Sequence, residues 1–132
     1  MVTVLDTNNA PKAGLKVYAF NGATYSGYTA TTDANGQAAF VTIYPGWYPG
    51  RTVHIHLKVH HDGIAQSFVF TSQLFFDDAL SDKVFIKLPY AGRGQRDTPN
   101  SRDGIYKQQL LLNVNEDGDG YAASFDIGLQ LS

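Results

Sequence analysis

The pair His54 and His56, separated by one residue, carries the main chemical signal of the sequence. Both lie in the run Thr52–His60, whose alternating β-branched and apolar residues are typical of a strand. Alternate side chains of a strand point to the same side, so the two imidazoles share one face. Imidazoles at this spacing can share one metal ion, and imidazole suits iron, copper, zinc and nickel. The run also fits a solvated strand face that happens to hold histidines, so the short motif leaves both interpretations open.

The segment directly before this strand is Tyr44-Pro-Gly-Trp-Tyr-Pro-Gly-Arg51. It places aromatic side chains, turn formers and one arginine next to the candidate metal ligands. Taken alone, Trp47 and Tyr48 fit the packing of aromatic rings over a core. In combination with the two histidines, the segment favours a metal site.

The whole run Pro45-Gly-Trp-Tyr-Pro-Gly-Arg-Thr-Val-His-Ile-His56 resembles the iron-binding core of the intradiol ring-cleavage dioxygenases. The likeness is to their small, single-domain, secreted-type members. It continues through Phe70–Asp78 and Arg93–Asn100 to Asp103-Gly-Ile-Tyr106, and spans residues 23 to 131. Several motifs in one order are far more specific than two histidines alone.

This resemblance implies an Fe(III) ion held by two tyrosinates and two histidines. The ligands that it implies are Tyr25, from the motif Tyr25-Ser-Gly-Tyr28, together with Tyr48, His54 and His56; Tyr28 is the alternative to Tyr25. It also implies catalytic roles for Arg51 and Gln73, which would stabilise the reacting ring, and for Tyr48 as a base. The implied partners are a small aromatic diol of the catechol type and O2, and the implied products are muconate-type diacids.

The residue types are consistent with this chemistry. A phenol has a pKa of about 10, so tyrosine binds as a phenolate only beside a strong cation. Hard anionic oxygen ligands favour ferric over ferrous iron, whereas the ferrous oxygenases use two histidines and a carboxylate.

The N-terminal third departs from the family pattern. The segment between Tyr25 and Tyr48 is shorter than in the family, and residues 1–42 also resemble transthyretin-type or Ig-like modules of bacterial surface proteins. A shortened member of the family and a hybrid therefore both remain open. The alternative function is a surface or binding module with an adventitious or vestigial metal site.

Composition narrows the class of protein. The chain has 132 residues, 43% of them hydrophobic and 17% charged, with a net charge of −2. This predicts one folded domain over residues 1–132 and gives no electrostatic reason to expect nucleic acid or a membrane as partner. Cysteine is absent, which excludes disulfides and thiolate metal sites. No signal segment is recognisable, and the expectation of a secreted protein follows from the resemblance only.

The elements that would position these residues are short strands separated by Asx- and Gly-rich turns, which predicts an all-β, antiparallel β-sandwich with long loops and one short helix. Asp77 or Asp78 would cap this helix after Phe76. A long loop is expected over Lys87–Tyr106. The predicted strands are Val2–Leu5, Leu15–Phe20, Thr24–Thr31, Gln37–Ile43, Thr52–His60, Ser67–Phe76, Gln109–Val114 and Tyr121–Leu131.

Three further patterns are given lesser roles. His60 and His61 precede a turn and are expected in solvent. The run Asn113–Asp119 resembles a calcium loop but lacks its bidentate glutamate. The arginines of Arg93–Arg102 could bind a substrate carboxylate or simply lie in solvent.

Overall fold

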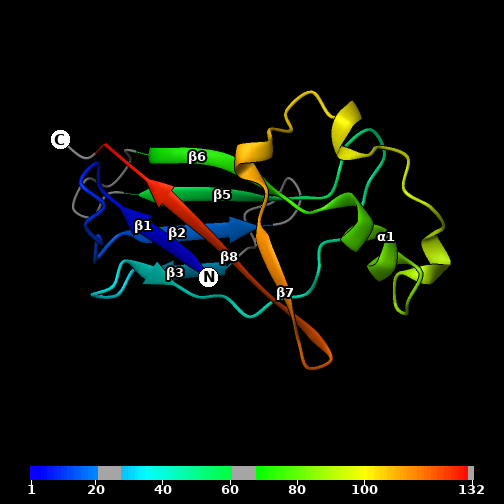
Figure 1. Cartoon of the computed structure of the whole chain (residues 1–132), viewed down its shortest axis with the longest axis horizontal. Coiled ribbons are helices and arrows are strands. Elements are labelled where there is room, and N and C mark those ends of the chain that lie inside the picture. The colour runs from blue at the N-terminus through cyan, green and yellow to red at the C-terminus, as the bar shows by residue number, and fades with distance from the viewer. Residues whose placement is uncertain (21–27, 61–67, 131–132) are drawn as a thin grey trace.

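Two four-stranded sheets pack face to face in the computed structural model of this chain, which describes residues 1–20, 28–60 and 68–130 (Figure 1). One sheet has the order β4 (Gln37–Ala38), β1 (Val2–Leu5), β8 (Gly120–Gly128) and β7 (Asn113–Asp117). The other has the order β3 (Tyr28–Thr31), β2 (Lys16–Phe20), β5 (His54–His60) and β6 (Phe68–Phe75). The predicted β-sandwich is confirmed.

One strand pair runs against the prediction of an antiparallel sandwich. β1 and β8 pair in parallel, with Val2 opposite Phe125 and Leu5 opposite Gly128, whereas the other pairs are antiparallel. These strands come first and last in the chain, so no tight hairpin turn joins them and fixes opposite directions.

The main core lies between the two sheets. In β8 and the residues after it, Ile127 and Leu129 are buried and alternate with the exposed Asp126, Gly128 and Gln130, as the sequence predicts. The buried residues of this core are Val2, Val4, Leu15, Val17, Ala38, Leu57, Val59, Leu74, Ile127 and Leu129.

The strand predicted at Gln37–Ile43 is much shorter than expected. Only Gln37 and Ala38 pair with β1, and the side chains of Val41 and Ile43 are 94% and 75% exposed. The chain leaves the sheet because the Tyr44 ring packs at the far end of the molecule, with its centroid 4.6 Å from that of Phe76. Tertiary packing therefore overrides a β-prone local sequence.

The strand predicted at Gln109–Val114 is shifted toward the C-terminus. Residues Gln108–Leu110 form a 3-10 turn, η3, and β7 begins only at Asn113. The backbone N–H of Leu112 donates to the carbonyl of Phe75 at 2.8 Å, which fastens the chain to the end of β6 before the new strand starts. The prediction was wrong because the apolar side chain of Leu112 packs against the core clusters outside a regular strand.

The predicted helix after Phe76 is confirmed as α1 (Asp78–Phe85). The carboxylate of Asp77 caps it by accepting a hydrogen bond from the N–H of Leu80 at 3.1 Å. Figure 1 shows α1 beyond one end of the sheets. No helix in the described ranges is long and apolar enough to cross a membrane.

A second apolar cluster joins α1 to the end of the sandwich. It consists of the buried Val53, Phe76, Val84 and Phe85, with Tyr44, Trp47, Leu80, Tyr90 and Tyr121 among the half-buried side chains packed against it. The long loop that follows α1 is irregular, as predicted, apart from the 3-10 turns η1 (Ala91–Arg93) and η2 (Asn100–Arg102). This end of the molecule holds the predicted functional segments.

The turn before β4 depends on a glycine. Gly36 has a φ of +73°, and a Cβ there would lie 2.5 Å from the carbonyl oxygen of Val4. Gly14 has a similar φ of +79° but no heavy atom within 4 Å of its Cβ position. An alanine at Gly14 would meet only the strain of left-handed backbone, whereas an alanine at Gly36 would also clash with the Val4 carbonyl.

We expect Gly14→Ala to lower the free energy of unfolding by about 1–2 kcal/mol, the cost of left-handed backbone for a residue with a Cβ. Gly36→Ala should lower it by clearly more, because the methyl group also meets the Val4 carbonyl. Urea unfolding of the two variants and the parent measures the difference. Equal losses would show that the Gly36 turn moves freely away from β1.

Candidate active site

Strand β5 presents a different chemistry on each face. Leu57 and Val59 are buried in the core between the sheets. His54 and His56, in the alternate register, belong to the outer face of the sheet. Their rings lie 4.9 Å apart between centroids, so the structure brings the two predicted ligands together.

The neighbouring strands complete this face. His56 lies opposite Gln73 of β6 on one side and Phe20 of β2 on the other. The predicted ligand Tyr25 falls in the connection that follows Phe20 and lies outside the described residues. The alternative ligand Tyr28 is the first residue of β3, where its backbone pairs with Ala19.

His54 is held in one tautomer. Its Nδ1 lies 2.7 Å from the carbonyl oxygen of Thr52, so we assign the proton to Nδ1, which donates. Its Nε2 then accepts, 2.6 Å from the hydroxyl oxygen of Tyr48. A backbone carbonyl on the second ring nitrogen is the usual support of an imidazole that binds a metal. The oxygen of Tyr48 and Nε2 of His54 thus meet at one point.

The pKa values of both imidazoles are lowered, which favours their neutral form. Burial lowers the pKa of His54, and the charge of Arg51 adds to this, against the opposing effect of the Thr52 hydrogen bond. Burial also lowers the pKa of His56, again with a contribution from Arg51. Neutral imidazole is the form that binds a metal ion.

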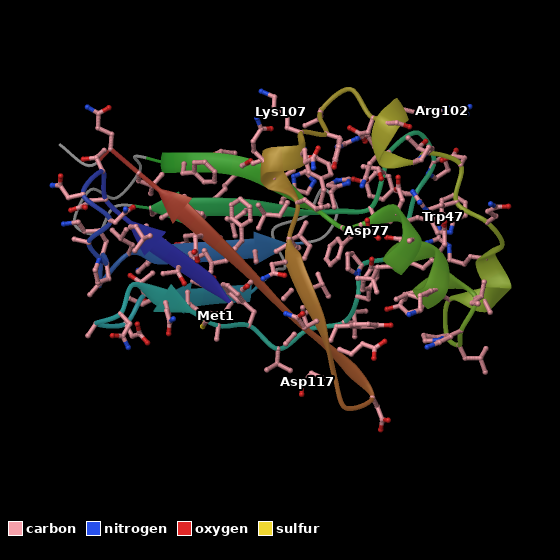
Figure 2. All side chains as sticks on the ribbon, in the orientation of Figure 1. Met1, Trp47, Asp77, Arg102, Lys107 and Asp117 are labelled. Atoms are coloured by element: carbon pink, nitrogen blue, oxygen red, sulfur yellow. The ribbon has the colours of Figure 1, made fainter. Side chains whose placement is uncertain are left out.

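A tight turn aims Tyr48 at His54. Tyr48 and Arg51 form an isolated bridge in which the N–H of Arg51 donates to the Tyr48 carbonyl at 3.4 Å. Gly50 supplies a φ of +82° within the turn. Trp47 lies near α1 in Figure 2, with the guanidinium of Arg93 4.7 Å above its ring. The Tyr48–Arg51 bridge and the Trp47–Arg93 contact thus help to fix the turn.

The predicted pair Arg51 and Gln73 is also brought together. Nη2 of Arg51 donates to Oε1 of Gln73 at 2.5 Å, and Nε donates to Oδ2 of Asp103 at 2.8 Å. These two contacts fix the plane of the guanidinium. Because Gln73 is paired with His56, the arginine lies next to the histidine pair.

Asp103 is the residue of this site whose role the sequence did not reveal. Its side chain is 1% exposed. Oδ2 accepts from Arg51 and from the N–H of Thr52 at 2.9 Å, while Oδ1 accepts from the N–H of Ile105 at 2.8 Å and of Tyr106 at 3.3 Å. Burial raises its pKa, but the Arg51 bond and these N–H groups outweigh it and hold the pKa below its usual value. In sequence, Asp103-Gly104 reads only as a turn.

Asn100 fastens the long loop to the same strand. Its Oδ1 accepts from the hydroxyl of Thr52 at 2.6 Å, and its Nδ2 donates to the carbonyl of Phe76 at 2.8 Å. Its backbone N–H donates to Asp78 at 3.1 Å. Asn100 therefore links the loop to the segment before β5 and to the start of α1.

Two arginines of the loop make structural contacts. Arg96, whose side chain is 6% exposed, forms ion pairs with Asp78 at 2.8 Å and Asp82 at 3.1 Å. Arg93 covers Trp47. The hypothesis that this run binds a substrate carboxylate is therefore wrong for Arg96, whose charge is already paired.

One other expectation changes. His60 is half-buried rather than in solvent, because its ring lies 4.8 Å from that of Tyr18; His61 lies outside the described residues. The run Asn113–Asp119 forms β7 and the tight turn to β8.

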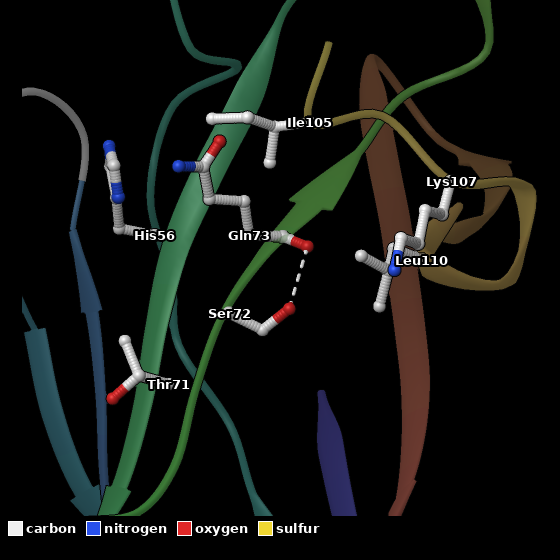
Figure 3. Close-up of a pocket in the computed structure, with 7 residues that line it drawn as sticks. All are labelled: His56, Thr71, Ser72, Gln73, Ile105, Lys107 and Leu110. Atoms are coloured by element: carbon white, nitrogen blue, oxygen red, sulfur yellow. Dashed lines mark hydrogen bonds between the residues drawn. The ribbon is translucent and has the colours of Figure 1, made fainter.

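A pocket of about 340 Å³ opens beside these groups (Figure 3). It has the size of a site for a small ligand. β5 contributes His56, β6 contributes Thr71, Ser72 and Gln73, and the segment after Asp103 contributes Ile105, Lys107 and Leu110.

In the part of the chain that the structure describes, no three His, Cys, Asp or Glu side chains are grouped so that they could hold a metal ion. The predicted site needs only two such residues, because tyrosines supply its other ligands. Tyr48, His54 and His56 are the predicted ligands that the structure describes, and their geometry fits this donor set.

Comparison with known proteins gives a clear structural likeness. No protein-family model and no curated protein sequence matches the chain. An intradiol ring-cleavage dioxygenase from Tetranychus urticae superposes with a TM-score of 0.87 at 24% identity, over 98% of this chain and 78% of that one. The dioxygenase domain of a dioxygenase carbohydrate-binding protein fusion from Streptomyces sp. SirexAA-E gives 0.75 at 25% identity, over 99% and 77%.

Larger dioxygenases share the same architecture. Catechol 1,2-dioxygenase from Pseudomonas arvilla C-1 matches with a TM-score of 0.68 at 20% identity, over 98% of this chain and 50% of its own. The chain therefore has the fold of the intradiol ring-cleavage dioxygenases. The likeness covers the N-terminal third of the chain as well.

Removing the negative charge of Asp103 should loosen both Arg51 and the start of β5. We expect Asp103→Asn to lower the free energy of unfolding at pH 7 by about 2–3 kcal/mol, since it leaves a partly buried arginine without its anion. Asp97→Asn is the control, because Asp97 is exposed and its partners are neutral: it accepts from the hydroxyl of Thr98 at 2.9 Å and from the N–H of Gly50 at 3.3 Å.

The loss should depend on pH in a defined direction. The pKa of Asp103 is lowered in the folded state, so its contribution is complete above about pH 4, the unfolded value. It disappears as the pH falls through the lowered folded value. Unfolding curves across this range should therefore converge for the parent and Asp103→Asn, and a constant difference would contradict the assignment.

Proposed function

We propose that the chain is a non-haem iron(III) dioxygenase that uses O2 to cleave catechol-type diols between their hydroxyl-bearing carbons, yielding muconate-type diacids. The observation that supports this most is the meeting of the Tyr48 oxygen and Nε2 of His54 at 2.6 Å, beside the ring of His56. The Arg51–Gln73 pair lies next to it. All of this occurs in a chain with the intradiol dioxygenase fold.

The donor set fits ferric iron. Tyr48, His54 and His56 would hold the ion together with Tyr25, and two phenolates with two neutral imidazoles suit a hard trivalent cation. When bound, the ion would supply a Lewis acid that draws electron density from the diol and makes its ring reactive toward O2. The Thr52 carbonyl keeps His54 in the tautomer that leaves Nε2 available.

The side chains around this point have separate tasks. The oxygen of Tyr48 is placed to accept a proton from an incoming diol hydroxyl. The positive charge of Arg51, whose plane is fixed by Asp103 and Gln73, would stabilise negative charge that develops on the ring. Since Oε1 of Gln73 accepts from Arg51, its amide nitrogen remains a donor on the pocket side, between His56 and Ile105 in Figure 3.

The alternative, a surface or binding module with an adventitious metal site, would not require these groups to converge. Catalysis distinguishes the two proposals. A dioxygenase should consume O2 with catechol and release a ring-opened diacid, whereas a binding module should do neither. Secretion remains a proposal that rests on the resemblance of the sequence alone.

We expect the purified protein to bind one ferric ion per chain and to absorb visible light through charge transfer from phenolate to iron. Tyr48→Phe removes one phenolate and should weaken and shift this band. Tyr44→Phe is the matched control, because Tyr44 hydrogen-bonds to Ser81 within the second apolar cluster, away from His54. Metal analysis and the visible spectrum measure both effects; an unchanged spectrum in Tyr48→Phe would exclude Tyr48 as a ligand.

We expect Arg51→Ala to keep the iron and its colour while kcat falls by roughly a hundredfold or more, the effect of losing one transition-state donor. Arg51→Lys should restore little, because an ammonium group does not reproduce the planar fork that meets Asp103 and Gln73. Since the alanine variant also leaves Asp103 unpaired, its folded fraction must be checked by circular dichroism. Unchanged turnover in a folded, iron-loaded variant would reduce Arg51 to a structural role.

A further inference from the structure

Thr52 lies directly before β5, at a point where the sheet does not hold the backbone. The pairing of β5 with β6 begins at His54, opposite Phe75, and no strand pairing within the described ranges includes Thr52. Thr52 is nevertheless buried, with only 2% of its surface exposed. Because buried polar groups need partners, contacts outside the sheet must fix its position.

All three polar groups of Thr52 have such a partner. Its N–H donates to Oδ2 of Asp103 at 2.9 Å, and its hydroxyl donates to Oδ1 of Asn100 at 2.6 Å. Its carbonyl accepts from Nδ1 of His54 at 2.7 Å. Two of these bonds come from the loop after α1, and the third leads to a candidate metal ligand. Thr52 therefore connects the loop to His54.

Asn100 is a fixed acceptor for the Thr52 hydroxyl. It is buried, its Nδ2 donates to the carbonyl of Phe76 at 2.8 Å, and its N–H donates to Asp78 at 3.1 Å. These contacts hold it against the start of α1. Since a hydrogen bond is directional, this bond restricts the orientation of Thr52 more narrowly than an apolar contact of the same size.

The orientation of Thr52 decides which nitrogen of His54 carries the proton. His54 is buried, so an Nδ1–H that lost the Thr52 carbonyl would be left without an acceptor at a considerable cost. The proton would then favour Nε2, which lies 2.6 Å from the oxygen of Tyr48. A protonated Nε2 is a donor and cannot bind a metal ion.

We propose that Asn100 is a positioning residue for metal binding: through Thr52 it keeps the proton of His54 on Nδ1 and leaves Nε2 to the metal. This rests on the proposed function, in which His54 is a ligand. Asp103 also holds Thr52, but it pairs with Arg51 as well. The Asn100 link can therefore be broken while the ion pair of Arg51 stays in place.

The test removes the hydroxyl of Thr52 while keeping the shape of the side chain. Long-range proton–nitrogen NMR spectra of the metal-free protein report which ring nitrogen of His54 carries the proton, with the signals assigned by their loss in His54→Gln. We expect the Nδ1–H form in the parent and a mixture with the Nε2–H form in Thr52→Val. The affinity for Fe(III), measured by competition with a chelator, should fall by about tenfold or more, the usual effect of removing a support of a metal-binding histidine.

Two further variants test the same link. Thr52→Ser keeps the hydroxyl and should retain both the Nδ1–H form and the affinity of the parent. Asn100→Ala removes the acceptor and should reproduce the effect of Thr52→Val, and the double variant should lose little more, since both changes break one bond. Circular dichroism checks the folded fraction, and Thr52→Val and Asn100→Ala each test the inference by themselves.

Thr32→Val is the matched control. Thr32 is also buried, with 4% of its surface exposed, and its hydroxyl accepts from the N–H of Leu15 at 2.9 Å and donates to the carbonyl of Lys12 at 2.7 Å. These partners lie in the segment before β2. The control should lose stability in the same way, but it should leave the proton of His54 and the affinity for iron unchanged.

The outcomes separate this inference from the proposed function. If the His54 proton shifts in Thr52→Val and Asn100→Ala but the iron-loaded parent cleaves no diol, the proposed function fails and the inference stands. If diols are cleaved but these variants match Thr32→Val in both measurements, the inference is overturned and the proposed function stands. A loss that Thr52→Ser does not restore would assign the effect to packing and would also overturn the inference.

Discussion

The buried carboxylate of Asp103 is the constraint on which the arrangement of the candidate site depends. It joins four donors from two parts of the chain: the guanidinium of Arg51 and the N–H of Thr52, directly before β5, and the N–H groups of Ile105 and Tyr106, after η2. Without this anion, the buried N–H of Thr52 would lose its acceptor, and Arg51 would lose its ion-pair partner while keeping its bond to Gln73. A single side chain therefore sets the start of β5, the plane of the arginine and one wall of the pocket.

The two faces of β5 have different roles: one packs in the core, and the other holds the candidate metal ligands. Leu57 and Val59 face the sheet that packs behind them, and their burial is shared with residues of both sheets. His54 and His56 face outward, where the contacts come from the Tyr48 turn and from β6. Because the period of a strand is two residues, one face can carry the histidines while the alternate residues pack in the core.

The sequence was most informative where chemistry is local. The spacing of His54 and His56 on a strand, the Tyr48 motif and the Asp77 helix cap each depend on neighbours within a few residues, and the structure places the histidines and the cap as predicted. What the sequence could not reveal depends on distant partners. Val41 and Ile43 have strand-like character but leave the sheet because Tyr44 packs against Phe76, more than thirty positions later in the chain.

The partners of charged side chains are also distant in sequence and could not be predicted from it. These contacts divide the long loop into two parts that differ in how many side-chain contacts they make. Before Asp103, the charge of Arg96 is paired with Asp78 and Asp82, and Asn100 is bonded to Thr52 and Phe76, so changes there would disturb α1 and β5 together. After Asp103, the side chains of Ile105 and Lys107 are exposed and line the pocket. Their backbone is positioned by Asp103, but their side chains support no core. The residue types in this second part can therefore vary with the ligand at little cost to the fold, and specificity would be expected to reside there.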